Sequence, residues 1–297
     1  MMTPPPQGQL TVDDLCRLAG VSRAGYYRNW QASAPRQEET GLRDALQRLA
    51  LAHPHYGYRR LGVALRREGW AANHKRVLRL MREDNLLCLR RKPFVPVTTD
   101  SRHEWEIVPN LARGLRVAAP DQLWVADITY IRLAEAFAYL AIVLDAFSRR
   151  VLGWALEEHL RASLAIDALA QAIALRRPAP DTVIHHSDRG VQYACGDYTQ
   201  RLAAHRIRPS MSRVGNPYDN AKAERFMRTL KEEEVDGRAY RDVTQARESI
   251  GTFIEQVYNR QRLHSALGYC SPVEFEDFLA QRVPAHAPEH AELITCP

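Results

Sequence analysis

The sequence lacks the cysteine patterns that mark a disulfide scaffold or a structural zinc site. Its five cysteines include no CxxC pair and show no regular spacing, and its eleven histidines complete no Cys/His zinc pattern. We therefore expect reduced thiols and no structural zinc. Three common catalytic signatures are also missing: a GxxxxGK[ST] phosphate loop, a GxSxG nucleophile turn and an HExxH zinc helix.

Long apolar runs are missing too. No stretch approaches the roughly 20 apolar residues that a helix needs to span a bilayer. The first ten residues, MMTPPPQGQL, lack the basic region and the apolar core of a signal peptide. These absences predict a cytoplasmic protein with no membrane contact.

The chain does carry an excess of positive charge. Of its 297 residues, 41 are Lys or Arg and 35 are Asp or Glu, which gives a formal net charge of +6. Residues 58–92 hold a large share of the basic residues and few acids. Such a segment favours a polyanion, most often nucleic acid, as the partner, although an ordinary solvated surface would explain the charge equally well.

The N-terminal part has the spacing of several short helices. Residues 10–30 predict a helix, a glycine turn and a second helix opened by Ser22, as in a helix-turn-helix. Further helices are predicted over residues 40–52, 58–68 and 73–83, and Asn73 suits the N-cap of the last one. We assign residues 1–89 to a small all-α, helix-turn-helix-like DNA-binding region. Residues 90–120, which contain four prolines, are expected to form an extended linker.

The helix predicted over residues 73–83 has two distinct faces. On a helical wheel, three basic side chains share one face and three apolar side chains share the opposite face. Such a helix can dock on its own domain and present its basic face to phosphate. The basic residues are Lys75, Arg79 and Arg82, and the apolar residues are Val77, Leu80 and Met81.

The pattern changes after residue 120. Three runs rich in apolar residues, LWVADITYIRL, AFAYLAIVLDAF and RRVLGWALEE, follow one another closely and predict an antiparallel meander. Helix 161–176, the strand TVIHHSD, helix 197–205 and a fifth strand, IRPSM, come next. Helices are then expected over residues 220–235 and 242–262. This order predicts an α/β unit: a mixed five-stranded sheet with helices on both faces.

Three acids in this region are candidates for a shared site. Asp127 lies inside a buried strand, where a carboxylate is costly unless it is paired or binds a metal. Asp188 ends the fourth strand, and strand ends are where ligands collect in α/β sheets. Glu224 shares one face of a predicted helix with Arg228 and Lys231. Each acid also has a simpler interpretation: a local hydrogen bond, a turn residue and a surface ion pair.

Together the three carboxylates could bind two hard divalent cations. Mg²⁺ prefers oxygen ligands and keeps several waters for substrate phosphate. Two such ions roughly 4 Å apart can activate a nucleophile and stabilise the leaving oxygen in phosphoryl transfer.

Several strings resemble one known family. WVADITYI, HSDRGVQY, GNPYDNAKAERF and YNRQRLHSALGYCSPVEFE are similar to OrfB-type transposases of bacterial insertion sequences of family three. The upstream strings GVSRAGYYRNW, YGYRRLGVALRREG, KRVLRLMREDNL and PNLARG are similar to the same family. The resemblance covers roughly residues 10–278, and 35 residues separate Asp188 from Glu224, which is typical of the group.

The resemblance implies a fold, a chemistry and partners. It implies an RNase H-like, retroviral-integrase-type core over residues 121–280, in which Asp127, Asp188 and Glu224 are the catalytic metal ligands for Mg²⁺ or Mn²⁺. It implies cleavage of element ends and strand transfer into target DNA, by an oligomer bound to DNA at the nucleoid. Members often act as a fusion with an upstream reading frame, which makes such a partner possible. Arg189 is expected either to reach DNA phosphate or to support its loop, and Gly190 to permit a tight turn.

Two other functions stay open at this point. An RNase H-like nuclease would use the same metals to hydrolyse nucleic acid without joining it. A non-catalytic DNA-binding regulator would use only the N-terminal helices. Residues 283–297 match no motif of the family, and residues 281–297 are expected to form a disordered tail.

Overall fold

The chain divides into two compact units, Met1–Cys88 and Leu89–Pro297. The computed structural model describes residues 11–30, 39–86, 88, 107–213 and 220–282. Much of the expected linker and nearly all of the expected tail lie outside these ranges. Within them, no helix is long and apolar enough to cross a membrane.

The first unit begins with two short helices, as predicted. Helix α1 (Val12–Leu18) and helix α2 (Arg23–Trp30) are joined by a turn in which Gly20 has a φ of 60°. A glycine adopts this left-handed conformation without the strain that a Cβ would bring. The Ser22 hydroxyl accepts a hydrogen bond from the Gly25 N–H at 3.1 Å, so it caps the start of α2.

Three further helices of this unit pack around leucines. They are α3 (Thr40–Ala52), α4 (Tyr58–Arg67) and α5 (His74–Glu83). Asn73 caps α5, because its side chain accepts a hydrogen bond from the Arg76 N–H at 2.8 Å. The predicted faces of α5 are confirmed: the apolar residues are buried and the basic ones are exposed. The buried side chains include Leu46, Leu61, Leu65, Val77, Leu80 and Met81.

The second unit is built on the predicted mixed sheet, with strand order β3-β2-β1-β4-β5. The meander β1 (Leu123–Arg132), β2 (Phe137–Asp145) and β3 (Val151–Glu157) is antiparallel. Strand β4 (Ile184–Ser187) pairs parallel to β1, and β5 (Arg208–Met211) pairs parallel to β4. The fold class predicted from the order of elements is therefore confirmed.

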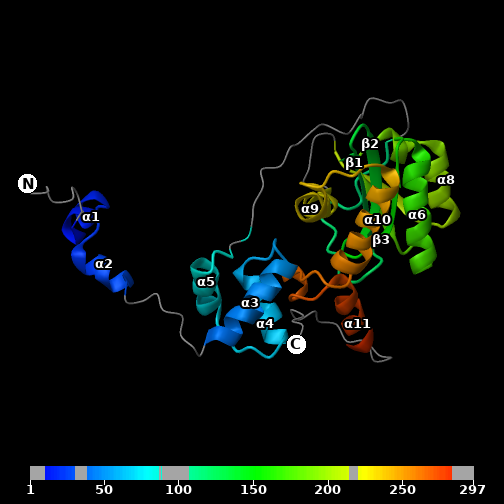
Figure 1. Ribbon diagram of the computed structural model, residues 1–297. Coiled ribbons are helices and arrows are strands. Elements are labelled where there is room, and N and C mark those ends of the chain that lie inside the picture. Colours follow the sequence, from blue (N-terminus) through cyan, green and yellow to red (C-terminus); the bar gives the residue numbers. More distant parts are fainter. Residues whose placement is uncertain (1–10, 31–38, 87, 89–106, 214–219, 283–297) are drawn as a thin grey trace, which may run out of the picture. The chain divides into compact units, whose positions relative to one another are not determined.

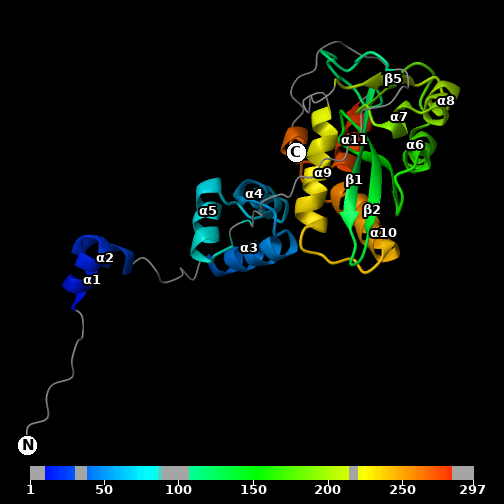
Figure 2. The same cartoon turned by 90° about the horizontal axis from the view of Figure 1, so that it is seen from above.

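Helices cover both faces of this sheet (Figures 1 and 2). Helix α6 (Ala162–Arg176) and helix α8 (Gly196–Ala204) pack on one face, around Trp124 and Leu169. The approach of α6 is so close that a Cβ on Gly153 of β3 would lie 2.1 Å from the Ala168 carbonyl oxygen. Only glycine fits at this crossing.

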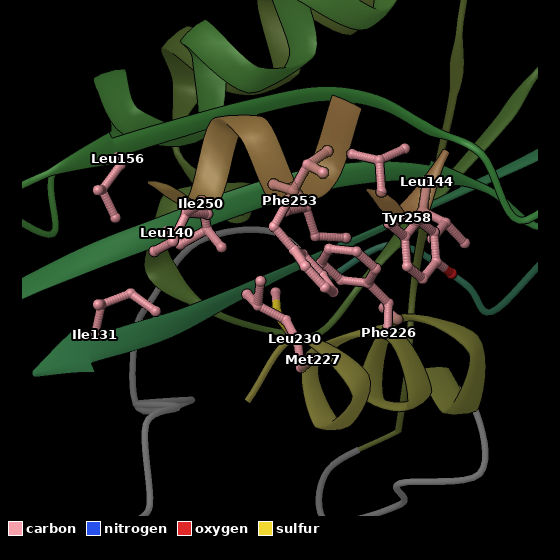
Figure 3. Packing of buried hydrophobic residues seen from close by; sticks show 14 of the residues in the cluster. Ile131, Leu140, Leu144, Leu156, Phe226, Met227, Leu230, Ile250, Phe253 and Tyr258 are labelled. Carbon is pink, nitrogen blue, oxygen red and sulfur yellow. The ribbon is translucent and has the colours of Figure 1, made fainter. Parts of the chain in front are cut away.

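The other face carries α9 (Ala221–Leu230) and α10 (Val243–Thr252). Figure 3 shows Phe226 and Leu230 of α9 directed towards Phe253 and Ile250, which lies beside the sheet residue Leu140. Both helices continue as π-helical turns, Lys231–Val235 after α9 and Phe253–Tyr258 after α10. The predicted single helices over residues 220–235 and 242–262 are therefore each divided into an α-helical and a π-helical part.

Two helices were not among the predicted elements: the short α7 (Val191–Ala194) and α11 (Pro272–Arg282). The carboxylate of Glu276 on α11 accepts a hydrogen bond from Arg150 at 2.7 Å and another from Arg176. These ion pairs are largely buried, so they fix α11 to the sheet unit. Since α11 ends at Arg282, the chain is still helical at the start of the expected tail.

The cysteine expectation is only partly right. Within the described ranges Cys16, Cys88 and Cys195 are reduced thiols that form no disulfide. Cys270, in contrast, is disulfide-bonded, so the expectation of a reduced thiol is wrong for this residue.

Candidate active site

Asp127 lies on β1 and faces the layer that contains α9. It stands opposite Ile142 of β2, whose side chain belongs to the core beneath α9 and α10. Its Oδ1 accepts a hydrogen bond from the Ile128 N–H at 2.9 Å. Burial, and then the nearby charge of Asp188, raise the pKa of Asp127 to about 8. The Glu224 charge adds to this rise, and the Ile128 N–H and the Lys231 charge oppose it.

The parallel pairing of β1 and β4 brings Asp188 next to Asp127. The register aligns Val125 with His186, and Asp127 and Asp188 each lie two residues further along their chains. Strand β4 ends at Ser187, so Asp188 stands at the strand end as predicted. Two acids at this point of the sheet repel each other, which agrees with the raised pKa of Asp127.

Gly190 leaves room for the Asp188 carboxylate. A Cβ at this position would lie 3.0 Å from Asp188 Oδ1, and the Gly190 N–H donates a hydrogen bond to the same oxygen at 2.9 Å. Its φ is −65°, a value that any residue can adopt. The backbone conformation at Gly190 therefore does not demand a glycine, and what the missing side chain provides is space beside the Asp188 carboxylate.

Asn220 fixes the start of α9 against β1. Its side-chain amide donates a hydrogen bond to the Ala126 carbonyl oxygen at 2.9 Å, and the residue is buried. This contact holds the helix against the residue that precedes Asp127. Glu224 follows one turn later on the exposed side of α9. Burial raises the pKa of Glu224, and the charge of Arg228 opposes that rise.

The three acids interact electrostatically without forming a closed metal cage. Across the described residues, no group of three His, Cys, Asp or Glu side chains could hold a metal ion. The donor set nevertheless suits a hard cation, because all its ligands are carboxylate oxygens. Asp127 also experiences repulsion from both other acids, which a divalent cation between them would turn into attraction.

The sequence comparisons identify the family. Residues 117–217 and 205–272 match the integrase core domain, and residues 36–94 match an HTH-like domain. The chain is 36% identical over 277 residues to the transposase InsF for insertion sequence IS3A of Escherichia coli (strain K12). The match covers 91% of this chain and 96% of that relative. The chain belongs to the IS3 family of transposases.

Another relative supports this membership. An uncharacterized 31 kDa protein of insertion element IS600 from Shigella sonnei is 37% identical over 268 residues, which cover 89% of this chain and 97% of the relative. The resemblance inferred from the sequence motifs is therefore confirmed.

Solved structures with a likeness to the chain include a simian T-cell lymphotropic virus intasome in complex with PP2A regulatory subunit B56 gamma. The match has 18% sequence identity and a TM-score of 0.43, and it covers 84% of this chain and 80% of that one. Another is the HTLV-2 integrase catalytic core domain in complex with magnesium, at 16% identity and a TM-score of 0.39. That match covers 52% of this chain and 96% of the viral domain.

Tyr193 of this IS3-family transposase was not predicted as a site residue. It lies on α7, is 3% exposed, and its hydroxyl has no hydrogen-bond partner among the residues that the structure describes. Burial raises its pKa well above the ordinary value, and the charges of Asp188 and Asp127 add to the rise. This hydroxyl is therefore close to the acids. The sequence signal was its position five residues after Asp188 within HSDRGVQY.

The two histidines before Asp188 have internal partners. His185 Nε2 lies 2.9 Å from the Tyr198 hydroxyl, and His186 Nδ1 lies 2.8 Å from the Ser210 hydroxyl. Burial, and then the charge of His186, lower the pKa of His185 to about 3, so its ring is neutral at physiological pH. Both contacts agree with a structural role.

The basic side chains near the acids differ in their surroundings. The Arg189 Nε donates a hydrogen bond to the Ser212 carbonyl oxygen at 2.8 Å, so this group supports the loop. The Lys231 ammonium lies 4.4 Å from the centroid of the Tyr130 ring, and burial lowers its pKa. Arg228 is exposed on the Glu224 side of α9.

The basic face of α5 is less free than the helical wheel suggested. The Arg79 guanidinium donates hydrogen bonds to the buried Glu39 at 2.7 Å and to Glu83 at 2.8 Å. Lys75 and Arg82 are exposed on the same face. Arg79 could contact phosphate only by weakening these ion pairs, so the outward charge of the face comes mainly from Lys75 and Arg82.

Proposed function

We propose that this transposase cleaves the ends of its element and joins them to target DNA, with Asp127, Asp188 and Glu224 as ligands of two Mg²⁺ or Mn²⁺ ions. When bound, the ions would activate the attacking oxygen and stabilise the leaving oxygen of the phosphodiester. The observation that carries the proposal is the electrostatic coupling of the half-buried Asp127 to Asp188 and to Glu224. We expect the three carboxylates to lie within roughly 4–8 Å of one another when the ions are bound.

The parts of the chain would have separate tasks. The acids hold the ions, and Asn220 keeps α9 at a fixed distance from β1. Arg228 and Lys231, on the Glu224 side of α9, would bind the scissile strand and place its phosphate against the ions. Lys75 and Arg82, with a smaller contribution from Arg79, would bind DNA phosphates through the helical unit. We also propose an oligomer on DNA, because both element ends must react within one complex.

A strand-transfer assay tests this function. The substrate is a duplex with the element's terminal sequence and a pre-cleaved 3′-OH, and the acceptor is an unrelated duplex. Wild-type protein should join them in Mg²⁺, and Asp127→Asn, Asp188→Asn or Glu224→Gln should each abolish joining. Glu232→Gln is a matched control, because Glu232 is an exposed acid close behind the same helix.

The outcomes separate the alternatives. A wild-type protein that hydrolyses the duplex and never joins it would be a nuclease. A protein whose only activity is DNA binding, unchanged by Asp127→Asn, would be a regulator. Full strand transfer by any one of the three acid variants would remove that residue from the site.

A further inference from the structure

A second group of cations lies on the other flank of α9. Lys222 and Arg225 belong to this helix, and Arg149 lies in the turn between β2 and β3. At about 100° per residue, Arg225 is about 100° around the helix axis from Glu224, and Lys222 is about 160° away in the same sense. The exposed surface of α9 therefore runs from Glu224 past Arg228 and Arg225 to the half-buried Lys222.

Two of these cations, Arg149 and Arg225, lie within electrostatic range of Tyr258. The Tyr258 ring is buried against Phe226 and His264, with centroid distances of 4.8 and 4.9 Å. In Figure 3 its hydroxyl points away from the other labelled side chains. Among the charges that act on this hydroxyl, that of Arg262 is the largest, followed by those of Arg149, Glu233 and Arg225. The charge of Arg149 also acts on the Lys222 ammonium. The residues therefore form one neighbourhood, although they come from a turn and two helical segments.

The three cations differ from nearby arginines because they have no carboxylate partner within the described part of the chain. Arg150 pairs with Glu276 at 2.7 Å, and Arg262 pairs with Glu233 at 2.7 Å. The salt bridges found in the described residues do not include Lys222, Arg149 or Arg225.

One acid does act on Lys222, namely the buried Asp145. Its carboxylate is already occupied, because it accepts hydrogen bonds from the backbone N–H groups of Asp121, Phe147 and Ser148 at 2.7 to 2.8 Å. Like charges that are held together and partly buried without a counter-ion destabilise a fold. An anion bound among the three cations would relieve this repulsion.

We propose that Lys222, Arg149 and Arg225, together with the Tyr258 hydroxyl, bind a backbone phosphate of DNA away from the reacting phosphate. This inference rests on the proposed function, which places a DNA strand at the acids on the opposite flank of α9. Phosphates of one strand recur about every 3.4 Å along the axis of a duplex. A strand that crosses α9 at Glu224 and Arg228 therefore brings further phosphates towards Arg225 and Lys222. The site would fix the direction in which DNA crosses the helix.

The test measures DNA binding by the full chain without metal, as a function of salt. Lys222→Gln and Arg149→Gln should each lower the slope of log K against log salt by about one, and the double variant by about two. Lys222→Arg should keep the wild-type slope, because it keeps the charge. Arg201→Gln is the matched control, since Arg201 is an exposed arginine on α8, on the opposite face of the sheet. It should leave the slope unchanged.

Two duplexes identify the source of the phosphate. A reduced slope only for the pre-cleaved terminal duplex would assign the site to the element end, and a reduced slope only for the unrelated duplex would assign it to the target. An unchanged slope of the double variant on both duplexes would overturn the inference. Melting temperatures control for folding, because loss of mutual repulsion should leave the variants at least as stable as wild type.

The joining assay separates this inference from the proposed function. If wild type joins DNA while the double variant keeps the wild-type slope, the phosphate site is wrong and the catalytic assignment stands. If wild type never joins DNA while the slope falls as expected, the catalytic assignment is wrong and the phosphate site stands.

Discussion

Replacing Asp127 by Asn should stabilise the metal-free protein while it removes strand transfer. Burial and the charge of Asp188 raise the pKa of Asp127 from 3.8 to about 8. An unfolded chain therefore releases this proton from about pH 4 upwards, whereas the folded protein keeps it until about pH 8. The stability that the protonated acid contributes is present below about pH 4 and is lost as the pH rises to about 8.

The size of the effect follows from the pKa shift. A rise of about 4 units, at about 1.4 kcal/mol per unit, gives an upper bound of about 5 kcal/mol at alkaline pH. Water entry and side-chain movement reduce this bound, so we expect about 2 kcal/mol. For a unit of this size, that corresponds to a rise in melting temperature of about 4–8 °C. An Asn side chain keeps the acceptor for the Ile128 N–H and carries no charge.

Thermal unfolding in a chelator, at about pH 5 and about pH 8.5, measures the difference. The melting temperature of Asp127→Asn should exceed that of wild type, and by more at the higher pH. Asp167→Asn changes an exposed acid on α6 and should have the wild-type melting temperature at both pH values. Added Mn²⁺ should raise the melting temperature of wild type and have little effect on Asp127→Asn. Equal melting temperatures for Asp127→Asn and wild type at both pH values would refute the reasoning.

Three other predictions concern single contacts. Gly153→Ala should destabilise the sheet unit by about 3 kcal/mol in urea unfolding, because its Cβ would lie 2.1 Å from the Ala168 carbonyl oxygen; unchanged stability would mean that α6 can shift. Tyr193→Phe should raise the free energy of unfolding by about 1 kcal/mol, because it removes a buried hydroxyl that has no partner in the described part of the chain; a loss of stability would reveal a contact that this hydroxyl makes. In DNA binding, Arg82→Ala should lower the salt slope by about one and Arg79→Ala by clearly less, because Glu39 and Glu83 already hold Arg79; equal losses would contradict this.

The sequence predicted most of the sheet and of the helices, for physical reasons that act locally. The strands around Asp127 are continuous apolar runs, as strands covered on both faces require. The faces of α5 follow from helical periodicity, and Asn73 caps the helix as its side chain allows. Asp127 and Asp188 stood out because a carboxylate in or at the end of a buried strand is costly without a partner.

Contacts between residues far apart in the sequence could not be predicted from the sequence alone. Nothing near Arg79 in the sequence shows that Glu39, forty residues earlier, is buried against it. The helical wheel of α9 showed Glu224 and Arg228 together, but it could not show that Arg149, from a turn between two strands, acts on Lys222. The helix α11 was missed, and its Glu276 binds Arg150 and Arg176, which lie 126 and 100 residues earlier in the chain.

The early end of the β1–β4 ladder has a consequence for folding. The register of this pair ends at Val125, while β1 continues to Arg132, so the acids lie where two strands separate. The meander can form from neighbouring segments, whereas the acids meet only after β4 and α9 have docked from far along the chain. The proposed metal binding would thus require these long-range contacts, and during refolding the Mn²⁺ affinity should appear after the sheet signal in circular dichroism. A chain that stops at the hairpin stage would have a sheet and no metal site.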